Sequence, residues 1–145
     1  MRFSSLGSGS RGNATLVEFE ETCLLVDCGF GIREATRRLS LFGKTPDVLT
    51  AILVTHEHSD HVGGVLSLAK KYSTPVYASH GTAVAAKLDS LATINIFDPH
   101  TAFSIGSLRV IPVPVPHDAR EPTQFILESD RHRLGVLTDL GTITP

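Results

Sequence analysis

The sequence predicts an α/β protein in which a sheet flanked by helices comes first and an antiparallel portion follows. Two apolar runs, "CLLVDCG" (23–29) and "AILVT" (51–55), have the continuous hydrophobic pattern of strands that are buried on both faces. Segments 32–43 and 62–71 instead repeat apolar residues at helical spacing. From Thr93 onward the pattern is that of strands alone. Strands that alternate with helices and then continue alone indicate this fold class.

The length, composition and charge of the chain limit the classes of protein to which it can belong. A chain of 145 residues can bury one sizeable core, and 41% hydrophobic with 19% charged residues is typical of a globular domain. The net charge of −2 gives no global basic field for nucleic acid, which leaves only a local patch. The sequence contains no apolar run of the roughly 20 residues that cross a bilayer, and "MRFSSLGSGS" lacks the apolar core of a signal peptide. We therefore expect a cytoplasmic protein that makes no membrane contact.

The first half of the chain provides the sheet and its helices. "RFSSL" and "NATLVEF" predict two short strands around the glycine-rich loop "GSGSRGN" (7–13). The first helix follows the strand 23–29 and ends near Gly43, which is placed as a C-terminal cap. The second helix buries the stripe that includes Val65 and Ala69 and leaves Lys70 and Lys71 outside.

The second half begins with one more strand and helix. "PVYAS" predicts a strand, and a third helix is expected from Thr82 to about Ser90. The remaining strands are expected at 93–97, 102–105, 108–116, 122–129 and 132–138.

The two cysteines are expected to be buried side chains rather than partners in a disulfide bond. Cys23 and Cys28 are an odd number of residues apart in one predicted strand, so they are expected on opposite faces of the sheet. We therefore expect no disulfide and two small buried side chains, as in a reducing cytoplasm.

Three prolines shape the segment "IPVPVPH". Pro112, Pro114 and Pro116 occupy every second position, so the missing N–H groups fall along one side of the strand. Such a side cannot be fully hydrogen-bonded, which predicts an edge or bulged segment that ends at His117.

Three histidines and two acidic residues crowd the stretch "LVTHEHSDHVGG" (53–64) directly after a buried strand. His56 and His58 are two apart on an extended loop, point the same way and suit one metal ion, whereas Asp60 and His61 begin a helix and face a second ion. Imidazole with carboxylate suits zinc, manganese or iron, and a bound ion removes the repulsion within the cluster. The alternative is a solvated histidine-rich loop.

The pattern H-x-H-x-D-H after a buried strand resembles the signature of the metallo-β-lactamase superfamily, and the resemblance extends over the whole chain. The segments "LGSGSRGNATLVE", "ILVTHEHSDHVGGV", "VPHDAREPTQFILE" and "LGVLTDLGTIT" are similar to the YycJ/WalJ (VicX) group within it. The resemblance implies an αββα sandwich with a mixed sheet and flanking helices. Residues 1–145 would be its N-terminal portion, truncated after the motif of a bridging aspartate.

The resemblance also implies a set of metal ligands. The first metal would be held by His56, His58 and His117, and the second by Asp60 and His61, with Asp139 of "TDLG" bridging both. The family's further histidine, well past the bridging aspartate, has no match in this chain. The remaining histidines, which we expect at the surface or in caps, are His80, His100 and His132.

Two divalent ions would lower the pKa of a shared water and stabilise a displacement at phosphorus. We expect Asp60 to assist as a proton acceptor as well as a ligand, and Asp27 to steady the histidine loop by accepting a hydrogen bond. Arg11 and Asn13 are placed to contact a phosphate from the glycine-rich loop, although this loop is equally explained as a plain turn between strands.

The sequence thus leaves three classes of function open. The first, which the resemblance favours, is a metal-dependent phosphodiesterase or exonuclease whose partner is DNA or another phosphodiester. The second is a hydrolase of the same superfamily that acts on a thioester, lactone or β-lactam. The third is an inactive metal-binding fragment. A chain that lacks half of the sandwich would expose a sheet face, so we also expect self-association.

Overall fold

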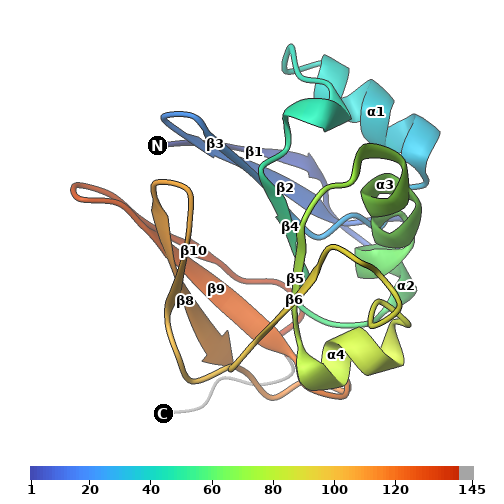
Figure 1. Cartoon of the computed structure of the whole chain (residues 1–145), viewed down its shortest axis with the longest axis vertical. Coiled ribbons are helices and arrows are strands. Elements are labelled where there is room, and N and C mark those ends of the chain that lie inside the picture. Colours follow the sequence, from blue (N-terminus) through green and yellow to red (C-terminus); the bar gives the residue numbers. More distant parts are fainter. Residues whose placement is uncertain (141–145) are drawn as a thin grey trace.

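The computed structural model describes residues 1–140 and arranges them in three layers (Figure 1). A layer of helices covers one face of a six-stranded sheet, and a four-stranded sheet packs against the other face. The first sheet contains β1 (Arg2–Gly7), β2 (Ala14–Phe19), β3 (Thr22–Val26), β4 (Ala51–Leu53), β5 (Val76–Ser79) and β6 (Ile94–Phe97). The second contains β7 (Phe103–Ile105), β8 (Leu108–Pro114), β9 (Thr123–Glu128) and β10 (Arg133–Val136). The helices are α1 (Ile32–Ser40), the short 3₁₀ helix η1 (Pro46–Val48), α2 (Ser59–Val62), α3 (Val65–Tyr72) and α4 (His80–Ala85).

The first sheet is mixed. β1, β2 and β3 form an antiparallel meander, whereas β3 to β6 run parallel to one another. Parallel neighbours need crossover connections, which the helices provide. The second sheet is antiparallel throughout, in the order β10-β9-β8-β7. The predicted α/β class is confirmed, and residues 1–140 supply three layers of an αββα sandwich.

One predicted strand belongs to a different sheet. The sequence placed 93–97 at the start of the antiparallel portion, but β6 pairs in parallel with β5, with Val76 opposite Ile94. The chain therefore leaves the first sheet only after Phe97.

Two apolar cores explain why the central strands are hydrophobic without alternation. Leu25 of β3 and Ile52 of β4 pack toward the helices, whereas Leu24 and Leu53 pack toward the second sheet. All four side chains are fully buried. Because neighbouring residues of a strand face opposite sides, a sheet that is covered on both faces requires apolar residues at every position.

The helices are shorter than the sequence predicts. The expected second helix is divided into α2 and α3 by the Gly63–Gly64 pair, although Lys70 and Lys71 are exposed as predicted. The third helix ends at Ala85 rather than near Ser90, because Lys87 has a left-handed backbone with φ of 56°. None of the helices in the described part of the chain has the length and apolarity that a bilayer crossing requires.

The predicted placement of the cysteines on opposite faces is wrong. Regular β3 ends at Val26, and Asp27 has a left-handed φ of 60° that breaks the alternation of side chains. Cys23 and Cys28 consequently pack into the same helix-side core. Both are buried and free, as expected.

The proline-rich strand has the predicted edge character. β8 pairs with β9 from Arg109 to Pro114, but with β7 only from Leu108 to Val110. The part that contains Pro112 and Pro114 therefore borders a strand on one side only, without a bulge. The chain beyond it forms the loop that carries His117.

Glycine backbones allow the histidine segment to lie directly on the loop that follows β3. A Cβ on Gly64 would lie 1.8 Å from the carbonyl oxygen of Phe30, and one on Gly29 would lie 1.8 Å from that of Asp60. The N–H of Cys28 donates to the carbonyl of His61 at 2.7 Å, and the N–H of Gly64 donates to the carbonyl of Cys28 at 2.8 Å. These contacts fix α2 against the end of β3.

We expect Gly64→Ala to destabilise the fold by about 1–3 kcal/mol or more, because the added methyl group meets backbone rather than a movable side chain. Gly64 has a φ of −103°, so the substitution tests close packing and not backbone strain. Gly31→Ala is the matched control, since within residues 1–140 no atom other than those of Gly31 and its two chain neighbours lies within 4 Å of its Cβ position. Urea unfolding of both variants measures the difference, and equal stabilities would contradict the packing argument.

Candidate metal centre

The predicted ligands come from four segments that meet at one end of the sheets. His56 and His58 lie in the loop after β4, and Asp60 and His61 lie in α2. His117 is in the loop between β8 and β9, and Asp139 follows β10. The polar residues therefore gather where strands of both sheets end.

Two groups of ligand atoms form there. His56, His58 and His117 each place one nitrogen within 4.8 Å of the others, and His117 Nε2 lies 3.3 Å from His58 Nδ1. His56, His61 and Asp139 form the second group. Asp139 Oδ2 lies 2.8 Å from His61 Nε2 and 3.6 Å from His56 Nε2. His56 is thus common to both groups.

Asp60 lies at the border of the second group. Its Oδ2 is 3.6 Å from His61 Nε2, and this oxygen accepts a hydrogen bond from Asn13 Nδ2 at 3.0 Å. The sequence grouped Asp60 with His61 and Asp139, whereas the second group in the structure takes His56 in its place. The role of Asp60 as a ligand stays a prediction.

A polar atom without a partner indicates that the groups suit a metal ion. His56 is fully buried, and its Nε2 has no hydrogen-bond partner within residues 1–140. Thr55 Oγ1 donates to Asp27 Oδ2 at 2.7 Å, so it accepts from the Nδ1–H of His56 at 2.9 Å. The Nε2 lone pair is therefore bare, an arrangement that costs free energy unless a cation or donor meets it. Burial, and then the charges of the neighbouring imidazoles, lower the pKa of His56 to about 4. The ring is thus neutral near pH 7, the form that binds metal.

Asp27 orients His61 of the second group through hydrogen bonds. Its buried carboxylate accepts hydrogen bonds from Thr55 N at 2.8 Å, Thr55 Oγ1 at 2.7 Å and His61 Nδ1 at 2.7 Å. Burial raises the pKa of Asp27, and the bonds from His61 and Thr55 act in the opposite direction. Burial also lowers the pKa of His61, but the hydrogen bond and charge of Asp27, together with the charges of Asp60 and Asp139, outweigh it, and the net shift is upward. Asp27 thus keeps the His61 Nδ1 protonated and turns Nε2 toward Asp139.

The structure separates the two loop residues that were expected to contact phosphate. Asn13 is buried, and its carboxamide is engaged by the loop itself. Its Oδ1 accepts from Gly9 N at 2.9 Å, and its Nδ2 donates to Gly9 O at 3.1 Å as well as to Asp60. This geometry favours a role in positioning Asp60 over contact with a ligand. Arg11 is exposed and lines a hollow beside Arg38, whose guanidinium lies 4.0 Å from the centroid of the Phe30 ring.

Sequence reasoning missed two side chains that hold the ligand loops. Glu57 Oε1 accepts a hydrogen bond from Arg120 N at 2.6 Å, which ties the loop of His117 to the histidine segment. Gln124 bonds to the backbone of Thr138, next to Asp139. Alternation along the extended loop could have indicated that Glu57 points away from its histidine neighbours. No pattern in the sequence near Glu57 identifies Arg120 as its partner.

The remaining histidines lie away from both groups. His80 begins α4, His100 lies in a turn and His132 lies in the connection between β9 and β10. All three are exposed, as the sequence predicts.

Two facing sheets with histidines and carboxylates gathered at the strand ends define a class of α/β proteins built to hold metal ions. The chain belongs to the metallo-beta-lactamase superfamily, whose family model matches residues 7–145. Over 99% of its length it is 35% identical to exodeoxyribonuclease WalJ of Streptococcus pneumoniae and 34% identical to exodeoxyribonuclease YycJ of Bacillus anthracis. The predicted resemblance is confirmed.

The chain spans about half the length of these curated relatives, 55% of WalJ and 56% of YycJ. The metallo-beta-lactamase fold protein YhfI of Bacillus subtilis has the same fold, with a TM-score of 0.76 at 20% identity over 92% of this chain and 59% of that one. The truncation of the domain 1–145 stays a prediction, and the residues after Leu140 lie outside the described part of the chain.

We expect Asp27→Asn to weaken metal binding about 10–100-fold, because asparagine loses the charge that orients His61 and presents an N–H₂ group in place of an acceptor. Asp98→Asn is the control, since the hydrogen bonds of Asp98 within residues 1–140 all lie in an exposed turn. Titration of each metal-free variant with zinc against a competing chelator measures the affinity. Equal affinities would show that Asp27 does not orient the site.

Proposed function

We propose that the chain is the metal-binding part of a phosphodiesterase, most specifically a DNA exonuclease. The observation that supports it best is the pair of ligand groups that share His56, because sites with two adjacent metal ions are suited to in-line displacement at phosphorus. The names of the relatives, exodeoxyribonucleases WalJ and YycJ, support DNA as the substrate class. The two free, buried cysteines support action in a reducing cytoplasm.

The two proposed ions share Asp139 and are otherwise assigned to different residues. His56, His58 and His117 would hold the first ion, and Asp60 and His61 the second, with Asp139 between them. When bound, two zinc or manganese ions, with iron as an alternative, supply Lewis acidity and a water of lowered pKa. The bare Nε2 of His56 and the carboxylate of Asp139 fit this requirement.

The residues of the chain perform the remaining tasks. Asp60 and Asp139 line a hollow together with Ser8, Gly9 and Thr138 of the two adjoining loops. A carboxylate at the wall of this hollow is placed to accept a proton from an attacking water, which is the role we propose for Asp60. Arg11, exposed at the tip of the glycine-rich loop, is proposed to contact a phosphate that flanks the reacting one.

The test is the hydrolysis of a 5′-labelled DNA oligonucleotide and of bis-p-nitrophenyl phosphate, with a thioester and a chromogenic β-lactam as competing substrates. We expect phosphodiester cleavage that requires manganese or zinc and stops with a chelator. Asp60→Ala should lower the rate by about 10²-fold or more because it removes the proton acceptor. Asp130→Ala, in the exposed connection after β9, should leave the rate unchanged.

Two results would contradict this function. Cleavage that survives the chelator would exclude a metal-dependent reaction. Turnover of the thioester or the β-lactam without any cleavage of the phosphodiesters would favour the second class of hydrolase.

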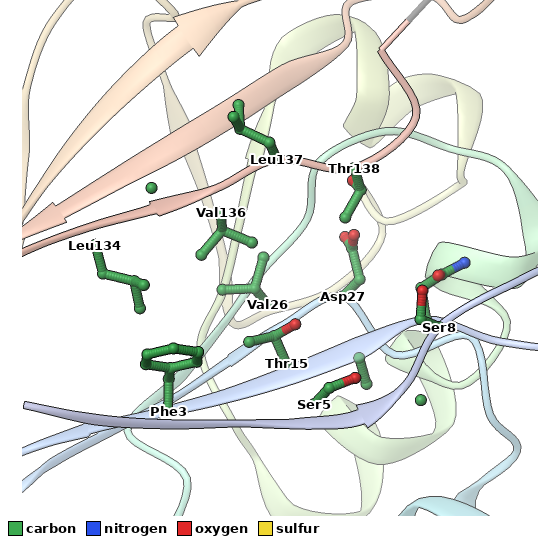
Figure 2. A pocket seen from close by; sticks show the side chains of 14 residues that line it. Phe3, Ser5, Ser8, Thr15, Val26, Asp27, Leu134, Val136, Leu137 and Thr138 are labelled. Atoms are coloured by element: carbon green, nitrogen blue, oxygen red, sulfur yellow. The ribbon is translucent and has the colours of Figure 1, made fainter.

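We also propose that the 145-residue chain pairs with a second copy of itself along the open side of the two sheets. Within residues 1–140, β1 and β10 are the end strands of their sheets. Figure 2 shows the pocket between them, with Phe3 and Leu134 at one end and Asp27 and Thr138 at the other. Phe3 and Leu137 are each 64% exposed at its rim. Unpaired strand edges beside exposed apolar side chains favour association with another chain.

Light scattering over a range of protein concentrations tests this pairing. We expect the average mass to rise with concentration, and Phe3→Glu to reduce the rise because a charge at the rim resists burial. Leu41→Glu is the matched control, since Leu41 is 70% exposed, slightly more than Phe3, but follows α1 on the helix layer. A monomer at every concentration would contradict the proposal.

A further inference from the structure

Asp139 lies beyond β10, which is the last strand among residues 1–140. The ladder between β10 and β9 ends with Val136 opposite Phe125. The next residues have no regular secondary structure, and Asp139 itself has a left-handed φ of 49°. A non-glycine residue in this region is held there only by its surroundings. The position of its carboxylate therefore depends on contacts made by neighbouring residues.

Gln124 makes those contacts with its side chain. Its Nε2 donates to the carbonyl oxygen of Thr138 at 2.6 Å, and its Oε1 accepts from the Thr138 N–H at 2.8 Å. The carboxamide thus satisfies both backbone groups of the residue that precedes Asp139, as a neighbouring strand would. Gln124 is only 1% exposed, so water does not compete for these bonds.

The same strand is joined to the histidine segment. The N–H of Thr123 donates to the carbonyl of Thr55 at 2.9 Å, and Thr55 directly precedes His56. The start of β9 therefore contacts both the backbone next to His56 and, through Gln124, the backbone next to Asp139. This arrangement sets the separation between the two ligands without any metal.

We propose that Gln124 is a positioning residue for the carboxylate of Asp139, and that it thereby sets the affinity of the second ligand group for a divalent cation. The proposal rests on the metal centre proposed above. It assigns a function to a buried polar side chain that touches neither ligand group.

The chemistry requires glutamine at this position. A glutamine carboxamide has one donor and one acceptor, which match the carbonyl and the N–H of Thr138. Glutamate has the same shape but turns an acceptor toward the carbonyl, and methionine fills the same space without either bond. Gln124→Glu therefore removes one of the two hydrogen bonds to Thr138, and Gln124→Met removes both.

The test uses the 145-residue chain, with Mn²⁺ as the probe and electron paramagnetic resonance of the free ion as the readout. Amide hydrogen exchange of Thr138 is measured on the metal-free protein in parallel. We expect Gln124→Met to abolish the protection of the Thr138 amide. One of two Mn²⁺ ions should bind about 10-fold or more weakly, and the other should weaken less because the imidazoles of His56, His58 and His117 still hold it. Gln124→Glu should have an effect of the same kind.

Val110→Ala is the control for lost stability alone, because Val110 is fully buried between the sheets and lies outside the ligand groups. It should lower the melting temperature without changing the ratio of the two affinities. Loss of Thr138 protection with both affinities unchanged, or weakened equally, would overturn the positioning role alone. An unsubstituted chain that binds fewer than two ions would overturn the proposed metal centre, and the positioning role with it.

Discussion

The buried carboxylate of Asp27 is the interaction on which the metal centre depends. It stands directly after β3, in a left-handed conformation that ends the regular strand. Its oxygens accept hydrogen bonds from Thr55 and His61, and Thr55 in turn orients His56. One carboxylate thus sets the orientation of both imidazoles that belong to the second ligand group. Burial keeps water from replacing these bonds, so the orientation is maintained without a metal ion.

Loops, rather than strands, present most of the ligands, and each loop is held by a side chain that bonds to backbone. Glu57 accepts from the N–H of Arg120 beside the His117 loop, Asn13 joins the glycine-rich loop to Asp60, and Gln124 bonds to the residue before Asp139. Backbone groups at the ends of strands lack ladder partners, and buried ones require substitutes. The structure meets this requirement with side chains that also fix the geometry of the site.

The sequence predicted the buried central strands and the histidine segment because both follow from local patterns. Continuous apolar runs indicated a sheet buried on both faces, and the short spacing from His56 to His61 brought ligands together without knowledge of the fold. The prediction for Cys28 failed because the left-handed backbone at Asp27 has no signal in the residue type alone. The bond of Gln124 to Thr138 was also missed, since it joins residues on separate segments whose pairing depends on the packed sheets.

The central claim is that the two groups of histidine and aspartate ligands form one centre for two metal ions. Anomalous X-ray scattering from crystals of the chain grown with Mn²⁺ tests it. We expect two peaks about 3.5–4 Å apart. One peak should lie between His58 and His117 and the other beside His61, with the carboxylate of Asp139 in contact with both. A single peak, or peaks that Asp139 does not touch, would contradict it.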